Sequence, residues 1–173
     1  MDGQVTLLAL RLMHVVGGVF WVGAMTVLAW FLFPAVQAAG PEGGKVMQQV
    51  MAGRNLSRWM GISALLTVAS GLILFGWFAH TSHGAWMRTP AAHGYSVGAL
   101  VALVGLGIGL GFGMRSMMRI QRIVREATLV SGAPTAEQAA EIQRMQARAA
   151  MAAKVASVLL LLAAAVMGTA RYY

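Results

Sequence analysis

Residues 12–31, LMHVVGGVFWVGAMTVLAWF, form a run of twenty residues without a single charged side chain. About twenty mostly apolar residues are what an α-helix needs to cross the hydrocarbon core of a bilayer. The run therefore predicts a membrane-spanning helix, which its apolar flanks extend to about residues 7–33. The acidic start and the length of this segment are unlike a cleaved signal peptide, so we expect it to be retained.

Three further apolar stretches of spanning length follow, at about residues 59–78, 95–114 and 155–170. The whole chain is 58% hydrophobic and only 10% charged, with a mean hydropathy of +0.69, whereas a soluble domain carries about 25% charged residues. The sequence thus predicts an all-α integral membrane protein. We expect a single four-helix bundle over residues 1–173, embedded in lipid.

The basic residues are distributed unevenly between the two ends of the predicted bundle. Of thirteen Lys and Arg residues, ten lie in the first and third connections and only Arg11, Arg88 and Arg171 lie at the opposite end. Cytoplasmic loops of membrane proteins are enriched in Lys and Arg. This predicts a multi-pass protein of a bacterial-type inner membrane with both termini outside. The enrichment of Lys and Arg in cytoplasmic loops also explains the net charge of +8, so nucleic-acid binding is not needed to explain it.

The connections are expected to differ in structure. Residues 115–154 have helical composition around a turn at 131–134, with Thr135 and Gln138 spaced as a capping box, so spans three and four should extend into the cytoplasm as a helical hairpin. Glu141 is expected to pair with Arg144 or Arg148 on the same helix. Pro34 is expected to end the first span, and residues 40–44 to form a loop before a short helix at 45–52.

All four histidines map to the outer half of the predicted bundle. His14 lies inside span one, whereas His80, His83 and His93 lie at or near the outer ends of spans two and three. Ionisable residues within spans usually face the interior of a bundle, and imidazole ligates haem iron, copper and zinc. For His14 the alternative is an interhelical hydrogen bond. For the other three the alternative is simple solvation.

Two glycine patterns accompany these histidines. His14, Gly18, Trp21 and Met25 follow one helical stripe, which is compatible either with a flat macrocycle beside Gly18 or with ordinary helix packing. In span three the positions of Gly105, Gly109 and Gly113 form a small-residue face, which predicts close helix contact, within the bundle or with other subunits of a membrane complex.

The absences are also informative. The chain has no cysteine, and its five carboxylates, Asp2, Glu42, Glu126, Glu137 and Glu141, all lie outside the spans. A thiolate metal site is thereby excluded, and a carboxylate-based ion pathway is disfavoured. The thirteen methionines are scattered, as expected of apolar filler rather than a copper path.

Two known families are similar to parts of this sequence. The run from His14 to Gly23, HVVGGVFWVG, followed by Pro34, resembles the first helix of the copper-resistance D-like membrane domains, and residues 54–74 resemble their next helix. A histidine seven residues before a tryptophan also resembles the start of the four-helix membrane protoporphyrinogen oxidases. This second resemblance implies a haem or porphyrin site near His14.

The function expected from the sequence is therefore electron transfer by a b-type haem near the outer face, with quinol as a candidate partner. His14 would be one axial ligand and His83, in preference to His80 or His93, the other. The candidate partners of the haem propionates, by charge-assisted hydrogen bonds, are Arg11, Arg88 or Arg171. The alternatives left open are an accessory subunit of a larger membrane complex and a copper-handling protein.

Overall fold

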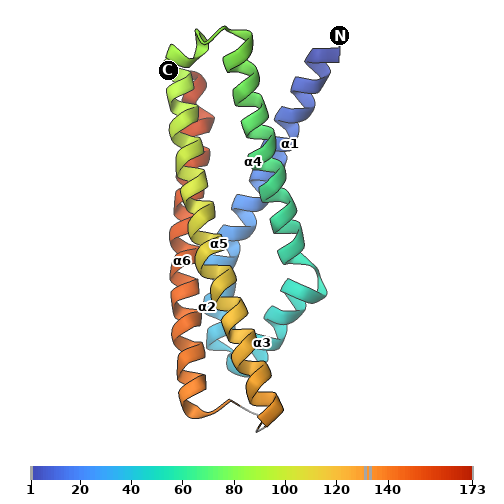
Figure 1. Ribbon diagram of the computed structural model, residues 1–173, viewed down its shortest axis with the longest axis vertical. Helices are drawn as coiled ribbons and strands as arrows, with labels where there is room; N and C mark the ends of the chain where they lie inside the picture. The colour runs from blue at the N-terminus through green and yellow to red at the C-terminus, as the bar shows by residue number, and fades with distance from the viewer. Residues whose placement is uncertain (1, 131, 133, 173) are drawn as a thin grey trace.

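Long helices dominate the computed structural model (Figure 1), which describes residues 2–130, 132 and 134–172, and the side chains of these except 2, 41, 114, 117, 128 and 130. The main helices are α1 (Asp2–Val27), α4 (Leu56–Thr81), α5 (Pro90–Val130) and α6 (Ala136–Thr169). Each belongs to a helical segment that is long and apolar enough to cross a membrane. The prediction of an all-helical chain with four candidate spans is confirmed.

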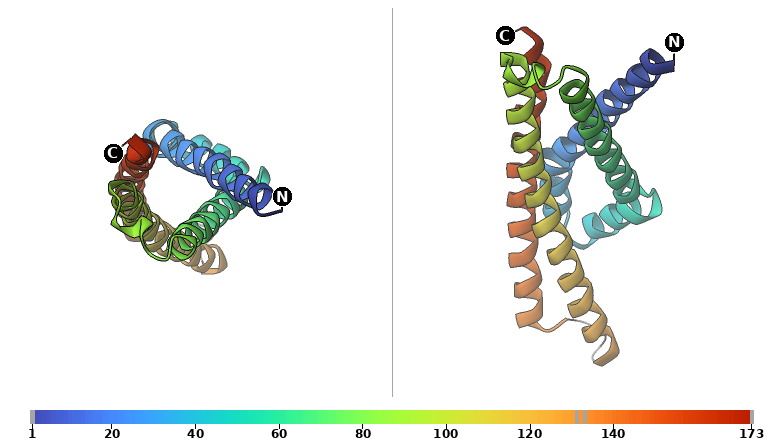
Figure 2. Two further views of the ribbon diagram at one scale, coloured as in Figure 1. Left: turned by 90° about the horizontal axis from the view of Figure 1, so that it is seen from above. Right: turned by 45° about the horizontal axis from the view of Figure 1, so that its top comes forward.

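The four helices are arranged as two pairs. Helix α1 packs along α4, and α5 packs along α6. The pairs are joined chiefly through α1 and α6, as Figure 2 shows from above and at a tilt. A small apolar core lies at this junction, where buried Trp21, Ala64 and Leu160 bring α1, α4 and α6 together. Both termini lie at the same end of the molecule (Figure 1).

The sequence predicts that the first span ends at Pro34, but in the structure the helix continues past this residue. A π-helical turn, η1 (Leu28–Leu32), follows α1, and α2 (Phe33–Ala38) continues beyond it with the proline in its first turn. The backbone N–H of Phe33 donates to the carbonyl of Leu28, five residues back. Proline lacks a donor and is tolerated in the first turn of a helix. The π turn shifts the backbone hydrogen bonds by one residue just before Pro34. The helix therefore continues past the proline.

The connection after α2 is also more helical than predicted. Helix α3 (Gly40–Gln48) includes the segment 40–44 that was expected to be a loop, with Pro41 in its first turn. The expected helix at 45–52 is present as the rest of α3 and a second π turn, η2 (Gln49–Gly53). The chain then turns into α4 at Asn55, which has a left-handed φ of 55°.

The predicted helical hairpin of residues 115–154 is formed by α5 and α6. Helix α6 begins with the expected capping box: the Thr135 side chain accepts from the backbone N–H of Gln138, whose side chain accepts from the Thr135 N–H. Residues 131 and 133 of the predicted turn lie outside the described residues, and Gly132 has a φ of 78°. Glu141 pairs across the hairpin with Arg119, at 2.8 Å, and not with Arg144 or Arg148. The cross-helix partner is possible because α5 lies directly beside α6.

The small-residue face of α5 is used inside the chain. Gly105 is buried, and a Cβ there would lie 3.3 Å from the Ala156 carbonyl oxygen; at Gly109 it would lie 3.3 Å from the Met25 Cε. These two glycines therefore allow α5 to lie close to α6 and α1, as the packing alternative predicts, and docking of another subunit through this face stays a prediction. At Gly113 no described atom lies within 4 Å of that position.

At the end that carries the termini, aromatic rings cover the turn between α4 and α5. Trp86, in the 3-10 turn η3 (Trp86–Arg88), packs against Phe75, Phe78 and Tyr95, with ring centroids 5.2, 5.6 and 6.2 Å away. The Arg11 guanidinium lies 5.5 Å from the centre of the Phe78 ring. Aromatic residues of this kind are enriched at membrane interfaces.

Candidate site at His14

The site is built where α1 crosses α4. His14 is half-buried, and its Nδ1 lies 2.8 Å from the backbone carbonyl oxygen of Thr67. A carbonyl oxygen only accepts hydrogen bonds, so Nδ1 carries the hydrogen. In the neutral ring this places the lone pair on Nε2. Among the described residues, no hydrogen-bond partner of Nε2 is found.

Two glycines allow the ring to approach α4. A Cβ at Gly71 would lie only 2.7 Å from the His14 Cε1 and 2.8 Å from its Nδ1. On α1, a Cβ at Gly17 would lie 2.8 Å from the Thr67 Oγ1. Any larger residue at either position would push the two helices, or the ring, apart. The bare backbone of α4 at Gly71 is thus the surface on which His14 rests.

A row of buried hydroxyls completes the α4 side of the crossing. Ser63, Thr67 and Ser70 are spaced by one helical turn each and are 8%, 8% and 1% exposed. Each hydroxyl donates to a carbonyl of its own helix three or four residues back. This is the usual way in which Ser and Thr are satisfied inside a membrane helix. The row gives α4 a mildly polar face toward α1 without leaving a donor unpaired.

The rest of the predicted stripe packs helices together. Trp21 is 6% exposed within the core cluster, and Met25 packs against that cluster. Gly18 faces Thr67, whose Cγ2 would be 3.5 Å from a Cβ at that position. For Gly18 and Trp21 the packing alternative therefore accounts for the structure, and their role in cofactor binding stays a prediction.

The outer histidines are placed differently from His14. His80, His83 and His93 are exposed, and His83 has a left-handed φ of 49° in the turn after α4. His80 follows Gly71 by nine residues, which is about 13 Å farther along α4. In the described part of the chain, no three His, Cys, Asp or Glu side chains gather as a metal-binding group. The structure thus brings His14 to the helix crossing alone.

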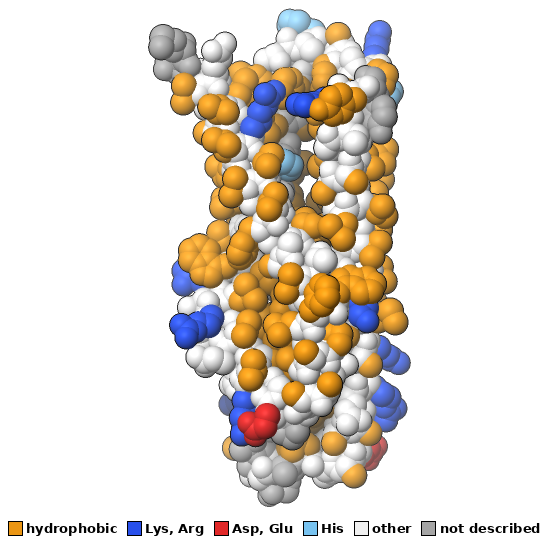
Figure 3. Space-filling view, turned by 180° about the vertical axis from the view of Figure 1, so that it is seen from behind, with side chains coloured by type: hydrophobic (Ala, Val, Ile, Leu, Met, Phe, Trp, Pro, Cys, Tyr) orange, Lys and Arg blue, Asp and Glu red, His pale blue; other side chains and the backbone are white. Residues whose placement is uncertain are grey.

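Seen from behind, the molecule is hollowed in its upper half between α1 and α6 (Figure 3). Arg11 lies on α1 one helical turn outside His14, and Arg88 is exposed in the turn before α5. Both arginines therefore lie toward the end of the molecule that carries the termini, although Arg11 is engaged with the Phe78 ring.

Sequence reasoning singled out His14 but missed its partners Thr67, Gly71 and Gly17. The hydroxyl spacing of Ser63, Thr67 and Ser70 was a visible signal, because a polar row in an otherwise apolar span marks an interior face. The hydrogen bond from His14 itself goes to a backbone carbonyl. Every residue has such a carbonyl, so the amino-acid sequence does not indicate this partner. Comparison of the chain with protein-family models, curated proteins and solved structures finds no match.

Proposed function

We propose that this chain is a membrane protein that binds a b-type haem, with His14 as an axial ligand. The observation that carries the proposal is the hydrogen bond from His14 Nδ1 to the Thr67 carbonyl, at 2.8 Å. Histidines that ligate metals usually donate their other ring N–H to a carbonyl or carboxylate, which fixes the tautomer and the ring orientation. The spacing of His14 and Trp21, which resembles the start of the four-helix membrane protoporphyrinogen oxidases, supports the same assignment.

The ligand set fits haem better than a bare metal ion. A protein site for zinc generally needs three or four side-chain ligands, and the described residues offer no group of three. In haem the macrocycle occupies four positions on the iron, so one or two protein ligands are enough. A single histidine at a helix crossing favours haem over the copper alternative for this reason.

The proposed role is electron transfer, with quinol as the candidate partner. A bound b-type haem would supply one-electron redox chemistry. The contribution of the chain is to hold the His14 ring through Thr67 and Gly71, and to keep that ring half-buried away from water. Arg11 and Arg88 would pair with the propionates at the outer end. The assignment of His83 as a second ligand stays a prediction.

The proposed orientation places the termini outside a bacterial-type cytoplasmic membrane. It is supported by the common end of the two termini (Figure 1) and by the concentration of Lys and Arg at the opposite end. The bias of Lys and Arg toward cytoplasmic loops then sets the direction.

The absorption spectrum of the purified protein, reduced minus oxidised, tests the haem proposal. Wild type is expected to show a Soret band and split visible bands, and His14→Ala to lose most of the haem. His83→Ala should change the coordination state, with His80→Ala and His93→Ala as matched controls that leave it unchanged. Haem occupancy that is equal in wild type and His14→Ala would refute the ligand assignment. A folded wild type without haem would refute the proposal as a whole.

A second candidate function, an accessory subunit, is favoured by one observation on α5. Positions Gly107 and Gly111 have no described atom within 4 Å of a built Cβ, so this small-residue face is open. Open faces of this type accept partner helices. A colourless protein that co-purifies with other membrane subunits, and loses them in Gly107→Leu, would support this function instead.

A further inference from the structure

Two depressions lie end to end between α5 and α6, at the basic end of the molecule. The first is an apolar groove of about 290 Å³ lined by Ile108, Phe112, Met151, Ala152, Val155 and Arg148. The second is a polar cleft of about 460 Å³ lined by Arg119, Glu137, Glu141, Arg144, Met145 and Arg148. Arg148 belongs to both. The apolar groove is therefore bordered by a guanidinium group.

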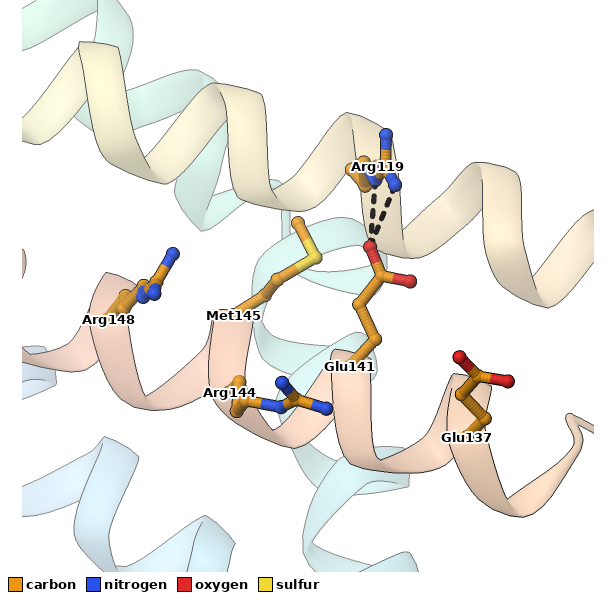
Figure 4. Close-up of a pocket in the computed structure, with 6 residues that line it drawn as sticks. All are labelled: Arg119, Glu137, Glu141, Arg144, Met145 and Arg148. Atoms are coloured by element: carbon orange, nitrogen blue, oxygen red, sulfur yellow. Dashed lines mark hydrogen bonds and ion pairs between the residues drawn. The ribbon is translucent and has the colours of Figure 1, made fainter.

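Arg148 is the charged residue of the polar cleft that also lines the groove. Arg144, on the same helix, donates from its Nε to the backbone carbonyl of Ala140 at 3.3 Å. Figure 4 shows Arg148 and Glu141 on α6 on either side of Met145, with Glu141 turned toward Arg119. Glu141 accepts from the Arg119 Nη2 at 2.8 Å and from its Nε at 3.0 Å. Within the described residues, Arg148 has no ion pair with a carboxylate. Because Glu141 is already neutralised by Arg119, the side of the cleft next to the groove stays positive.

The groove lies at the boundary of the apolar part of the molecule. Lys154, the last basic residue before the apolar end of α6, has its ammonium 5.3 Å from the centre of the Trp30 ring. The Trp30 indole N–H donates to the Ser157 hydroxyl at 2.9 Å. Trp and Lys in such positions mark the membrane interface. Arg148 is six residues beyond Lys154, or about 9 Å along the helix, which is close to the thickness of a headgroup layer of roughly 5–8 Å.

We propose that this surface binds one anionic phospholipid. Its headgroup phosphate contacts Arg148, and one of its acyl chains lies in the groove between Phe112 and Val155. Basic pockets between membrane helices are suited to anionic headgroups, and bidentate hydrogen bonding to phosphate is a property of Arg. The apolar lining selects a lipid over a soluble phosphate, because only a lipid fills both depressions. This inference is independent of haem binding.

Lipid retention by the full-length protein in detergent, measured by native mass spectrometry, tests the proposal. The probes are phosphatidylglycerol and phosphatidylcholine with identical acyl chains. The anionic lipid is expected to bind more tightly, and Arg148→Gln to weaken its binding about fivefold, the effect of one basic residue at a membrane surface. Arg148→Lys should retain most of the binding. Arg125→Gln, on α5 and outside the lining of both depressions, also removes one positive charge and should leave binding unchanged.

Three outcomes would overturn the proposal. Equal retention of the two lipids would show that the negative charge of the headgroup does not contribute to binding. Equal losses in Arg148→Gln and Arg125→Gln would show a diffuse charge effect instead of a site. Displacement of phosphatidylglycerol by inorganic phosphate at equal concentration would show an anion site without an acyl groove.

Discussion

At the scale of the residue, the geometry of the His14 site depends on the absence of a side chain at Gly71. A Cβ at position 71 would lie only 2.7 Å from the His14 Cε1, which is too close for the imidazole ring to keep its place. Its Nδ1 bonds to the Thr67 carbonyl, one helical turn earlier on α4. Position and tautomer of the ring are thus set by backbone atoms of a neighbouring helix.

Gly71→Ala is expected to displace the His14 ring without removing it. The added methyl would meet the ring and its hydrogen-bonded nitrogen, while helix propensity would rise slightly. If His14 ligates haem, this variant should show weakened haem binding or shifted visible bands in the absorption spectrum. Gly76→Ala, on the same helix with no described atom within 4 Å of its Cβ, is the matched control. A spectrum of Gly71→Ala identical to that of the control would contradict this account.

The residue scale also shows how far the sequence leads at this site. His14 was identifiable because a histidine in the middle of an apolar run is conspicuous. Gly71 was not, because glycine is common in membrane helices and its role depends on which face of α4 meets α1. That face is fixed by packing between segments 53 residues apart, which no local pattern contains.

At the scale of the element, hydropathy located all four helical segments, but the break expected at Pro34 was absent and the loop expected at 40–44 was helical. The chain does break between α2 and α3, where Gly40 has a φ of 60°, yet both prolines stand in first turns, where no N–H is required. The π turn at Leu28–Leu32 makes the first of these possible. Such a turn depends on one shifted hydrogen bond and leaves no signature in composition. The capping box at Thr135, by contrast, was predicted because its chemistry is local.

Gly105→Leu is expected to loosen the α5–α6 pair. Its side chain would press on the Ala156 carbonyl oxygen and the Leu159 Cβ, both 3.3 Å from the Cβ position. Overpacking of this kind costs about 1–3 kcal/mol, so the apparent melting temperature in detergent should fall by several degrees. Gly107→Leu, where the Cβ position is open, should leave it unchanged or slightly raised. Gly109→Leu should be intermediate, because it meets the flexible end of Met25. Equal melting temperatures for the Gly105 and Gly107 variants would refute the packing role.

At the scale of the whole molecule, the two ends differ in kind. The end with the termini carries the aromatic cluster around Trp86, and the other end carries the long hairpin and most of the basic residues. Helix α5 has 41 residues and α6 has 34, or about 60 and 50 Å, against a hydrocarbon core of about 30 Å. Both helices of the hairpin are therefore longer than a crossing of the hydrocarbon core requires.

The topology can be tested with two fusion reporters, one active only outside the cytoplasm and the other active only inside it. A reporter that works only outside the cytoplasm is expected to be active when fused after residue 173 and inactive when inserted at Gly132. A cytoplasmic reporter should give the reverse pattern. The reason is the excess of basic residues at the hairpin end, which resists translocation. Cytoplasmic activity from the C-terminal fusion would reverse the proposed orientation.

The pairing of the helices has a consequence for how the chain is made. Helices α1 and α4 are translated first and contact mainly each other, and α5 and α6 follow as a second, self-contained hairpin. The two helices of each hairpin can therefore insert into the membrane and pair with each other during translation. The contacts that unite the halves, Trp21 with Leu160 and Trp30 with Ser157, need α6 and form last. The His14 crossing lies wholly within the first hairpin, so it needs no residue of the second hairpin in order to form.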